Sequence, residues 1–334
     1  MSEAVVTASK LLQRLSTQLA QLLVCREATI REVLIALLCR GHLLLEDAPG
    51  LGKTTLAKAV ARSLDLEFRR VQCTPDLMPA DITGVSIFEE SSRSFRFVQG
   101  PVFTNILLVD EINRASPRTQ SALLEAMAEG TVTADRETHS LREPFLVLAT
   151  QNPVEFSGTY PLPEAQLDRF FMRVSMGYPS QEDEVRVMQL NKLGDPLARA
   201  TPVLKGEVLV KLQRLVASLP VETRVLDYIA ALIRATREHA QIRLGASPRG
   251  SIALMQAAQA QAVIDGTGLV TPQLVQNVFV PVIAHRVLLR SANQDAEAVL
   301  KEIVAAVPVP GMPGKGSSSS VAPVSSSGLT LAAE

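Results

Sequence analysis

A short apolar run passes into a glycine-rich loop at residues 42–55, which read HLLLEDAPGLGKTT. The apolar part, His42–Glu46, has the length and composition of a buried strand, and the residues from Lys53 onward are predicted to be helical. A glycine-rich turn between a strand and a helix presents backbone N–H groups and the positive end of the helix dipole to an anion. This arrangement predicts a phosphate-binding loop; a chance Gly-Lys-Thr turn is the alternative.

Two side chains of the loop have predicted roles in binding a nucleotide. Lys53 is expected to reach the β- and γ-phosphates, and the Thr54 hydroxyl is expected to bind Mg²⁺. Asp47 stands where the usual G-x-x-x-x-G-K-[ST] pattern has its first glycine. The residues predicted to surround the phosphates are Asp47, Ala48, Pro49, Gly50, Leu51, Gly52, Lys53, Thr54 and Thr55.

Further apolar runs alternate with helical stretches along the chain. They are Glu67–Gln72, Asn105–Asp110, Phe145–Thr150 and Phe170–Ser175. Strands that alternate with helices favour a parallel sheet with crossover helices, so the predicted fold class is α/β. Two polar segments interrupt the alternation: Ser86–Val98 is predicted to be a β-hairpin, and Thr131–Leu141 is predicted to be a second β-rich insert.

Two carboxylates follow directly on the third predicted strand, which ends at Asp110 and Glu111. The carboxyl ends of parallel strands meet at the ligand-binding edge of a sheet, so both side chains are expected beside the phosphates. Asp110 is expected to hold the Mg²⁺ ion, and Glu111 is expected to orient and polarise the attacking water. An acidic cap at the start of a helix is the alternative.

Three more polar residues are candidates for contact with the phosphates. Asn152 follows the fourth strand and is predicted to hydrogen-bond the γ-phosphate or the water; an Asx-type turn before Pro153 is the alternative. Arg169 precedes the fifth strand, where it is either a solvated charge or a finger that acts in a neighbouring subunit. Arg249, near the start of a helix, either reaches the phosphates or is an ordinary surface cation.

The chain changes character near residues 177–180, after which the sequence shows helical periodicity and no strand signals. Helices are predicted at 207–219, 222–240, 248–265 and 272–290, the last two with proline at their first position. The predicted segments are an N-terminal helix at 1–24, an α/β nucleotide-binding domain at 25–178, a helical domain at 179–307 and a disordered tail at 308–334.

Composition excludes several classes of protein. There are 33 Lys and Arg residues and 34 Asp and Glu residues, giving a net charge of −1, so a broadly basic nucleic-acid-binding surface is not expected. The hydrophobic fraction of 47% suits a large core. The longest apolar run, Val33–Cys39, is far shorter than a membrane span, and the three cysteines lack a disulfide or metal-site pattern. We therefore expect a soluble, cytoplasmic protein.

Together these residues resemble the MoxR family of the AAA+ ATPases. The similarity is most specific in DEINRA at 110–115, PRTQSALLEAM at 117–127, ATQNP at 149–153 and GTYPLPEAQLDRF at 158–170. It covers roughly residues 20–310. The chain departs from the family pattern at Asp47 and at Val24–Glu27, where a glycine-containing motif on the adenine side is expected.

The resemblance implies a five-stranded AAA+ core with a helical lid, which binds ATP and Mg²⁺ and assembles into a ring, usually a hexamer. It implies that Asn152 is sensor 1, Arg169 an arginine finger acting in trans, and Arg249 sensor 2. The two inserts are similar to the helix-2 and pre-sensor-1 hairpins of related AAA+ proteins.

It further implies a chaperone that remodels a protein client or helps to insert a metal cofactor, often alongside a von Willebrand factor A domain protein. The alternatives are a scaffold whose assembly is controlled by nucleotide with little turnover, and a DNA translocase.

Overall fold

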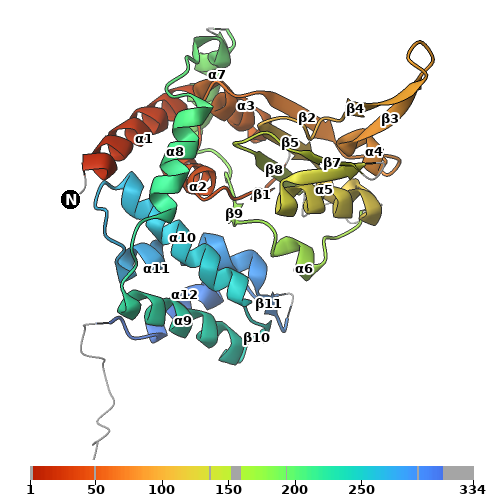
Figure 1. Ribbon diagram of the computed structural model, residues 1–334. Coiled ribbons are helices and arrows are strands. Elements are labelled where there is room, and N and C mark those ends of the chain that lie inside the picture. Colours follow the sequence, from red (N-terminus) through yellow and green to blue (C-terminus); the bar gives the residue numbers. More distant parts are fainter. Residues whose placement is uncertain are drawn as a thin grey trace, which may run out of the picture.

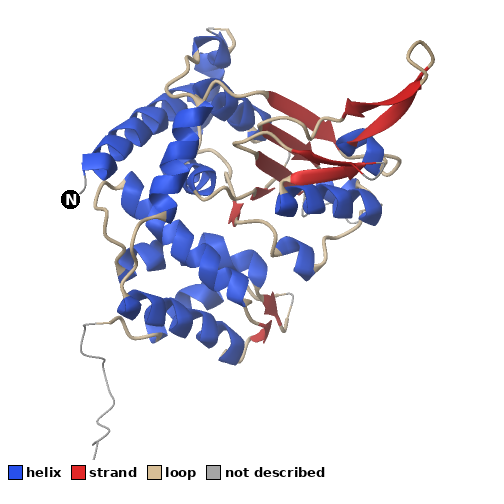
Figure 2. Ribbon diagram, in the orientation of Figure 1, coloured by secondary structure: helices blue, strands red, loops and turns tan. Residues whose placement is uncertain are grey.

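Five parallel strands form the central sheet of the computed structural model, which describes residues 3–48, 50–134, 137–151, 159–192, 194–291 and 293–310. The strand order is β2-β5-β8-β1-β9, and helices surround the sheet (Figures 1 and 2). These strands are β1 (Leu43–Glu46), β2 (Phe68–Gln72), β5 (Ile106–Asp110), β8 (Leu146–Gln151) and β9 (Met172–Val174). Each lies within or next to a predicted run, which confirms the α/β class.

The strand register brings the predicted polar strand ends to one edge of the sheet. Gln72 at the end of β2 pairs with Asp110, and Glu46 at the end of β1 pairs with Gln151 of β8. Because all five strands are parallel, their carboxyl ends share this edge. The loop after β1 leaves the sheet from the same edge.

Both faces of the sheet are buried, as is usual for parallel strands. On β5, Ile106 and Leu108 pack into one core cluster and Leu107 and Val109 into another. The first cluster contains residues of α1 (Glu3–Leu22), α2 (Glu27–Leu38) and α3 (Lys53–Ser63), and the second contains residues of α5 (Pro117–Glu129).

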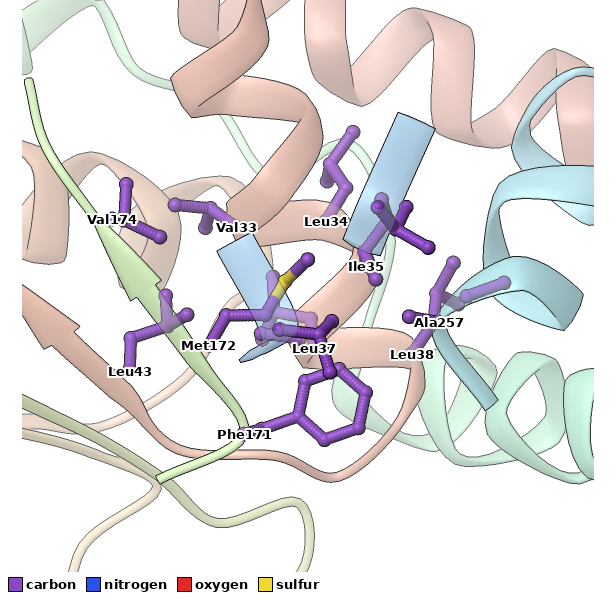
Figure 3. Close-up of a cluster of buried hydrophobic side chains, with 14 of the residues drawn as sticks. Val33, Leu34, Ile35, Leu37, Leu38, Leu43, Phe171, Met172, Val174 and Ala257 are labelled. Atoms are coloured by element: carbon purple, nitrogen blue, oxygen red, sulfur yellow. The ribbon is translucent and has the colours of Figure 1, made fainter. Parts of the chain in front are cut away.

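The first cluster continues without a break into the helices that follow the sheet. Figure 3 shows Leu34 and Leu38 of α2, Met172 of β9 and Ala257 of α10 in one apolar group. Helix α1 packs against α2, α3 and α10. The helices after the sheet are α7 (Gln181–Lys192), α8 (Gly206–Ala217), α9 (Thr223–Glu238), α10 (Pro248–Ile264), α11 (Pro272–Ile283) and α12 (Ala296–Ala306).

Two predictions for this helical region are wrong. Strands do occur after residue 177: β10 (Ile242–Leu244) pairs antiparallel with β11 (Leu288–Leu289), and both are too short to show an alternating pattern. The helix predicted at 272–290 ends at Ile283 and continues only as a 3₁₀ turn, η3 (Ala284–Arg286). Pro281 lies in its last turn and has no N–H to donate to the turn before it.

Both predicted inserts are hairpins in the structure. The first pairs β3 (Gly84–Glu89) with β4 (Ser94–Gln99) and projects away from the sheet (Figure 1). The second pairs β6 (Thr131–Ala134) with β7 (Glu137–Ser140). Short helices α4 (Pro79–Thr83) and α6 (Glu164–Leu167) precede β3 and β9 respectively. The tail predicted from residue 308 lies outside the described residues except for 308–310.

Candidate nucleotide-binding site

The loop between β1 and α3 has the backbone that a phosphate-binding turn requires. Gly50 and Gly52 have φ angles of 85° and 87°, in the left-handed region that favours glycine. A Cβ atom added at Gly50 would have no atom within 4 Å, so the loop is open at this point. Helix α3 begins directly at Lys53, and the free N–H groups of its first turn therefore face the loop. Pro49 lies outside the described residues.

Lys53 is held inside the loop that it is predicted to serve. Its Nζ donates a hydrogen bond to the backbone oxygen of Asp47 over 2.6 Å. Burial lowers the pKa of Lys53, and the charges of Asp47, Asp110 and Glu111 act in the opposite direction. The structure thus brings Lys53 into electrostatic contact with both carboxylates from the end of β5.

Asp47 has a structural use that explains why it replaces the glycine of the usual pattern. Its carboxylate is buried and accepts three hydrogen bonds from the segment after β9. Oδ2 accepts from the backbone N–H of Met176 over 2.6 Å, and Oδ1 accepts from Ser175 Oγ over 2.7 Å and from the N–H of Gly177 over 3.2 Å. A glycine at this position could make none of these bonds.

Both oxygens of Asp110 are engaged by neighbouring strands. Oδ1 accepts from Thr150 Oγ1 over 3.2 Å, and Oδ2 accepts from Arg70 Nε over 2.6 Å. Thr150 Oγ1 also accepts from the backbone N–H of Glu111 over 2.9 Å, so one hydroxyl fixes both acidic residues. Glu111 has a φ of 56°, and its carboxylate pairs with Arg114 over 3.0 Å. Such a left-handed conformation in a non-glycine residue is common at functional sites.

A cavity of about 850 Å³ lies beside the loop. The loop residues Gly50 to Gly52, together with Thr54 and Thr55, form one wall, and Val24 to Arg26 and Met176 to Pro179 form another. Ligand cavities commonly have volumes of about 300–1,000 Å³. The segment Val24–Glu27, which departs from the family pattern, therefore does contribute three residues to the cavity wall.

The remaining predicted residues lie elsewhere. Arg169 is exposed, and its Nη1 donates to the backbone oxygen of Leu124 over 2.7 Å. Arg249 is exposed in the first turn of α10. Neither residue lines the cavity. Asn152 lies outside the described residues, so the structure does not place it.

Three residues that contact the predicted acids were not predicted from the sequence. Arg70, Thr150 and Arg114 each contact Asp110 or Glu111. Arg114 lies three residues after Glu111 at the start of a helical turn. This spacing could have predicted an ion pair between the two residues. Contacts of Arg70 and Thr150 depend on which strands are neighbours, and the sequence does not show that order.

Family models match both parts of the chain. A model of the ATPase family associated with various cellular activities (AAA) matches residues 42–172, and a model of the AAA lid domain matches residues 234–305. Chaperone MoxR1 of Mycobacterium tuberculosis (strain ATCC 25618 / H37Rv) is 38% identical over 302 residues, which cover 88% of this chain and 79% of that protein. The chain belongs to the MoxR family of AAA+ ATPases.

Two further comparisons support membership of the MoxR family and its fold. The uncharacterized protein YeaC of Bacillus subtilis (strain 168) is 48% identical, over 83% of this chain and 88% of its own length. A crystal structure of a candidate ATPase from Cytophaga hutchinsonii ATCC 33406 superposes with a TM-score of 0.86 at 33% identity, covering 92% of this chain and 97% of that one. The predicted AAA+ core with a helical lid is confirmed.

Proposed function

We propose that this MoxR-family chain hydrolyses ATP at the loop after β1 and uses the energy to remodel a protein client. The observation that carries the proposal is the convergence of Lys53, Asp110 and Glu111 beside an open loop whose glycines adopt the left-handed conformation. The adjoining cavity has room for the rest of a nucleotide.

Mg²⁺ fits the donors present at this site. The Thr54 hydroxyl and the Asp110 carboxylate are hard oxygen ligands of the kind that Mg²⁺ prefers. When bound, the ion would neutralise charge on the phosphates. Glu111 would orient the attacking water and accept its proton, for which its carboxylate must leave Arg114. Asn152 would complete the site as sensor 1.

A neighbouring subunit of a hexameric ring would supply one further group, and the helical domain would supply another. We assign Arg169 as a finger that enters the site of the neighbouring subunit, and Arg249 as sensor 2. The exposure of Arg169, away from the cavity of its own subunit, supports this assignment, because a finger acting in trans must be accessible in the isolated subunit. Arg249 is likewise exposed, at the first turn of a helix.

The β3–β4 hairpin supports contact with a protein client. Phe95 is 75% exposed and Phe88 is 55% exposed, and their rings contact one another edge to face with centroids 5.4 Å apart. Exposed aromatic pairs on a projecting hairpin mark an interaction surface. A protein with a von Willebrand factor A domain would act alongside the ring, and insertion of a metal cofactor into the client would be one outcome of remodelling.

ATP turnover measured against protein concentration tests this proposal. Activity per subunit should rise with concentration, since each site needs a finger from its neighbour. Lys53→Ala should abolish nucleotide binding, whereas Glu111→Gln should bind ATP and lose turnover by at least roughly 100-fold. Glu207→Gln, the same change on the exposed first turn of α8, is the matched control and should behave as wild type.

Two outcomes would contradict the proposal. Wild-type turnover by the Glu111→Gln protein would remove Glu111 as the residue that activates water. Tight ATP binding with negligible turnover by the wild type would favour the nucleotide-controlled scaffold instead.

A further inference from the structure

Arg26 stands at the start of α2 without helping that helix to form. It occupies the N-cap position, and its side chain makes no capping hydrogen bond there. Short polar residues are strongly preferred as N-caps, and the positive end of the helix dipole repels a cation. The side chain is also exposed rather than packed in the core. Helix stability therefore does not explain why an arginine occupies this position.

A short linker segment, Ser175–Gly177, leads from the phosphate-binding loop to Arg26. A Cβ atom added at Gly52 would lie 3.8 Å from Met176 Cε, so Met176 borders the loop. A Cβ atom added at Gly177 would lie 3.8 Å from both Nε and Cζ of Arg26. The loop, the linker segment and the arginine therefore follow one another around the nucleotide cavity, which all three line.

The guanidinium of Arg26 is anchored before any ligand arrives. Its Nη2 donates a hydrogen bond to the backbone oxygen of Ser175. The linker segment is in turn held to the phosphate-binding loop by the three hydrogen bonds that the Asp47 carboxylate accepts. A planar group that is already fixed beside a cavity loses little freedom when a ligand binds to it.

The end of the cavity around Arg26 suits a base better than a phosphate. The apolar side chains that line it are Leu22, Leu23 and Val24 before Arg26, and Val187 and Met188 of α7. Asp183 of α7 also lines the cavity, and its charge acts on Cys25 as that of Arg26 does, so it lies at the same end. A carboxylate there repels phosphates, which places the phosphates at the loop and the base beside Arg26.

We propose that Arg26 is a base-binding residue, on whose guanidinium plane the purine ring of the bound nucleotide stacks. This inference rests on the proposed function and names the group that holds the base. Guanidinium planes stack on the faces of bases and of other aromatic rings. In this chain, Arg26 thus takes over a task for which the family pattern has a glycine-containing motif.

Binding of ADP is compared with binding of ribose 5-diphosphate, which has the sugar and phosphates of ADP but no base. The proposed reaction consumes neither ligand, so calorimetry with Mg²⁺ can give both dissociation constants for the full chain. Arg26→Ala should raise the dissociation constant of ADP roughly 5- to 30-fold. It should change that of ribose 5-diphosphate less than about twofold, because this ligand has nothing to stack.

Two further variants separate stacking from charge and from folding. Arg26→Lys keeps the charge and a donor for Ser175 but has no plane, so it should still bind ADP at least about threefold more weakly than wild type. Arg31→Ala is the matched control: Arg31 lies on the same helix, pairs with Asp265 and does not line the cavity, so both dissociation constants should stay unchanged. Thermal unfolding without ligand checks that each variant is folded.

Three results would overturn the stacking and leave the nucleotide site intact. They are equal weakening of both ligands by Arg26→Ala, wild-type affinity of that variant for ADP, and wild-type affinity of Arg26→Lys for ADP. The first would show that Arg26 acts on the phosphates or through the linker segment, and the last that its charge alone suffices. Failure of the wild-type chain to bind ADP at all would refute the proposed nucleotide site, and the stacking with it.

Discussion

Replacement of Asp47 by alanine should destabilise the protein without removing any backbone group of the phosphate-binding loop. Three donors lose a charged acceptor: the buried N–H of Met176, the partly buried N–H of Gly177 and the exposed hydroxyl of Ser175. An unsatisfied buried donor costs about 1–3 kcal/mol, and the other two bonds contribute about 0.5–1.5 kcal/mol each where water can replace the acceptor. Together these contributions predict a loss of about 2–6 kcal/mol in the free energy of unfolding.

Urea unfolding is the suitable assay, and far-UV circular dichroism is the suitable signal because the chain has no tryptophan. Asp47→Asn should lose about 1–2 kcal/mol, because an amide keeps one acceptor oxygen but turns a donor toward one of the three groups. Asp81→Ala is the matched control: that exposed carboxylate accepts one backbone bond, from Met78, and its loss should cost less than about 1 kcal/mol.

Asp47→Gly is the most informative variant, since it restores the residue of the usual loop pattern. If Asp47 were merely tolerated in place of glycine, this variant would be as stable as wild type or more so. Equal stability would therefore refute the structural use of the carboxylate.

Three other predictions concern groups around the site. Arg70→Met frees one oxygen of Asp110 for Mg²⁺. The Mg²⁺ concentration that half-saturates ATP-dependent thermal stabilisation should therefore fall roughly two- to fivefold, as expected for a half-exposed ion pair. An unchanged concentration would show that Arg70 does not affect metal binding. Burial raises the pKa of Glu32 to about 7, with Arg26 opposing the shift, so folding favours the protonated acid and stability falls as pH rises from about 4.5 to about 7. Glu32→Gln should therefore gain about 1–3 kcal/mol over wild type at pH 8 and nothing at pH 4 in urea titrations, and a pH-independent difference would contradict this. Arg169→Ala should bind ATP with nearly wild-type affinity yet lose roughly 100-fold or more in turnover, and equal turnover would exclude it as a finger.

The sequence predicts best those features whose cause is local. His42–Glu46 and the loop after it combine an apolar run, two glycines and a lysine within fourteen residues, so both the strand and the phosphate-binding loop are predictable. Ser247 and Thr271 could be identified as helix caps because each precedes a proline, and both side chains accept from the first turn of their helices.

Features that depend on distant partners could not be predicted. The contact of Arg70 with Asp110 requires that β2 lies beside β5, although 33 residues separate the end of one strand from the start of the other. The sequence predicts that Arg286 is an ordinary surface cation at the end of a helix. In the folded chain it forms an ion pair with Asp168. The three-residue strand β10 is too short for its side-chain alternation to be seen.

The continuous core has a consequence for dividing the molecule. Cleavage near residue 178, where the sequence changes character, would strip α8 and α10 from the apolar face of α2. It would also leave the backbone oxygen of Leu37 without the amide of Gln213, which donates to it over 2.7 Å. The amino-terminal fragment would expose a wide apolar surface and should aggregate. In a fusion or a transplant between relatives, the unit to exchange is therefore the whole of residues 3–310.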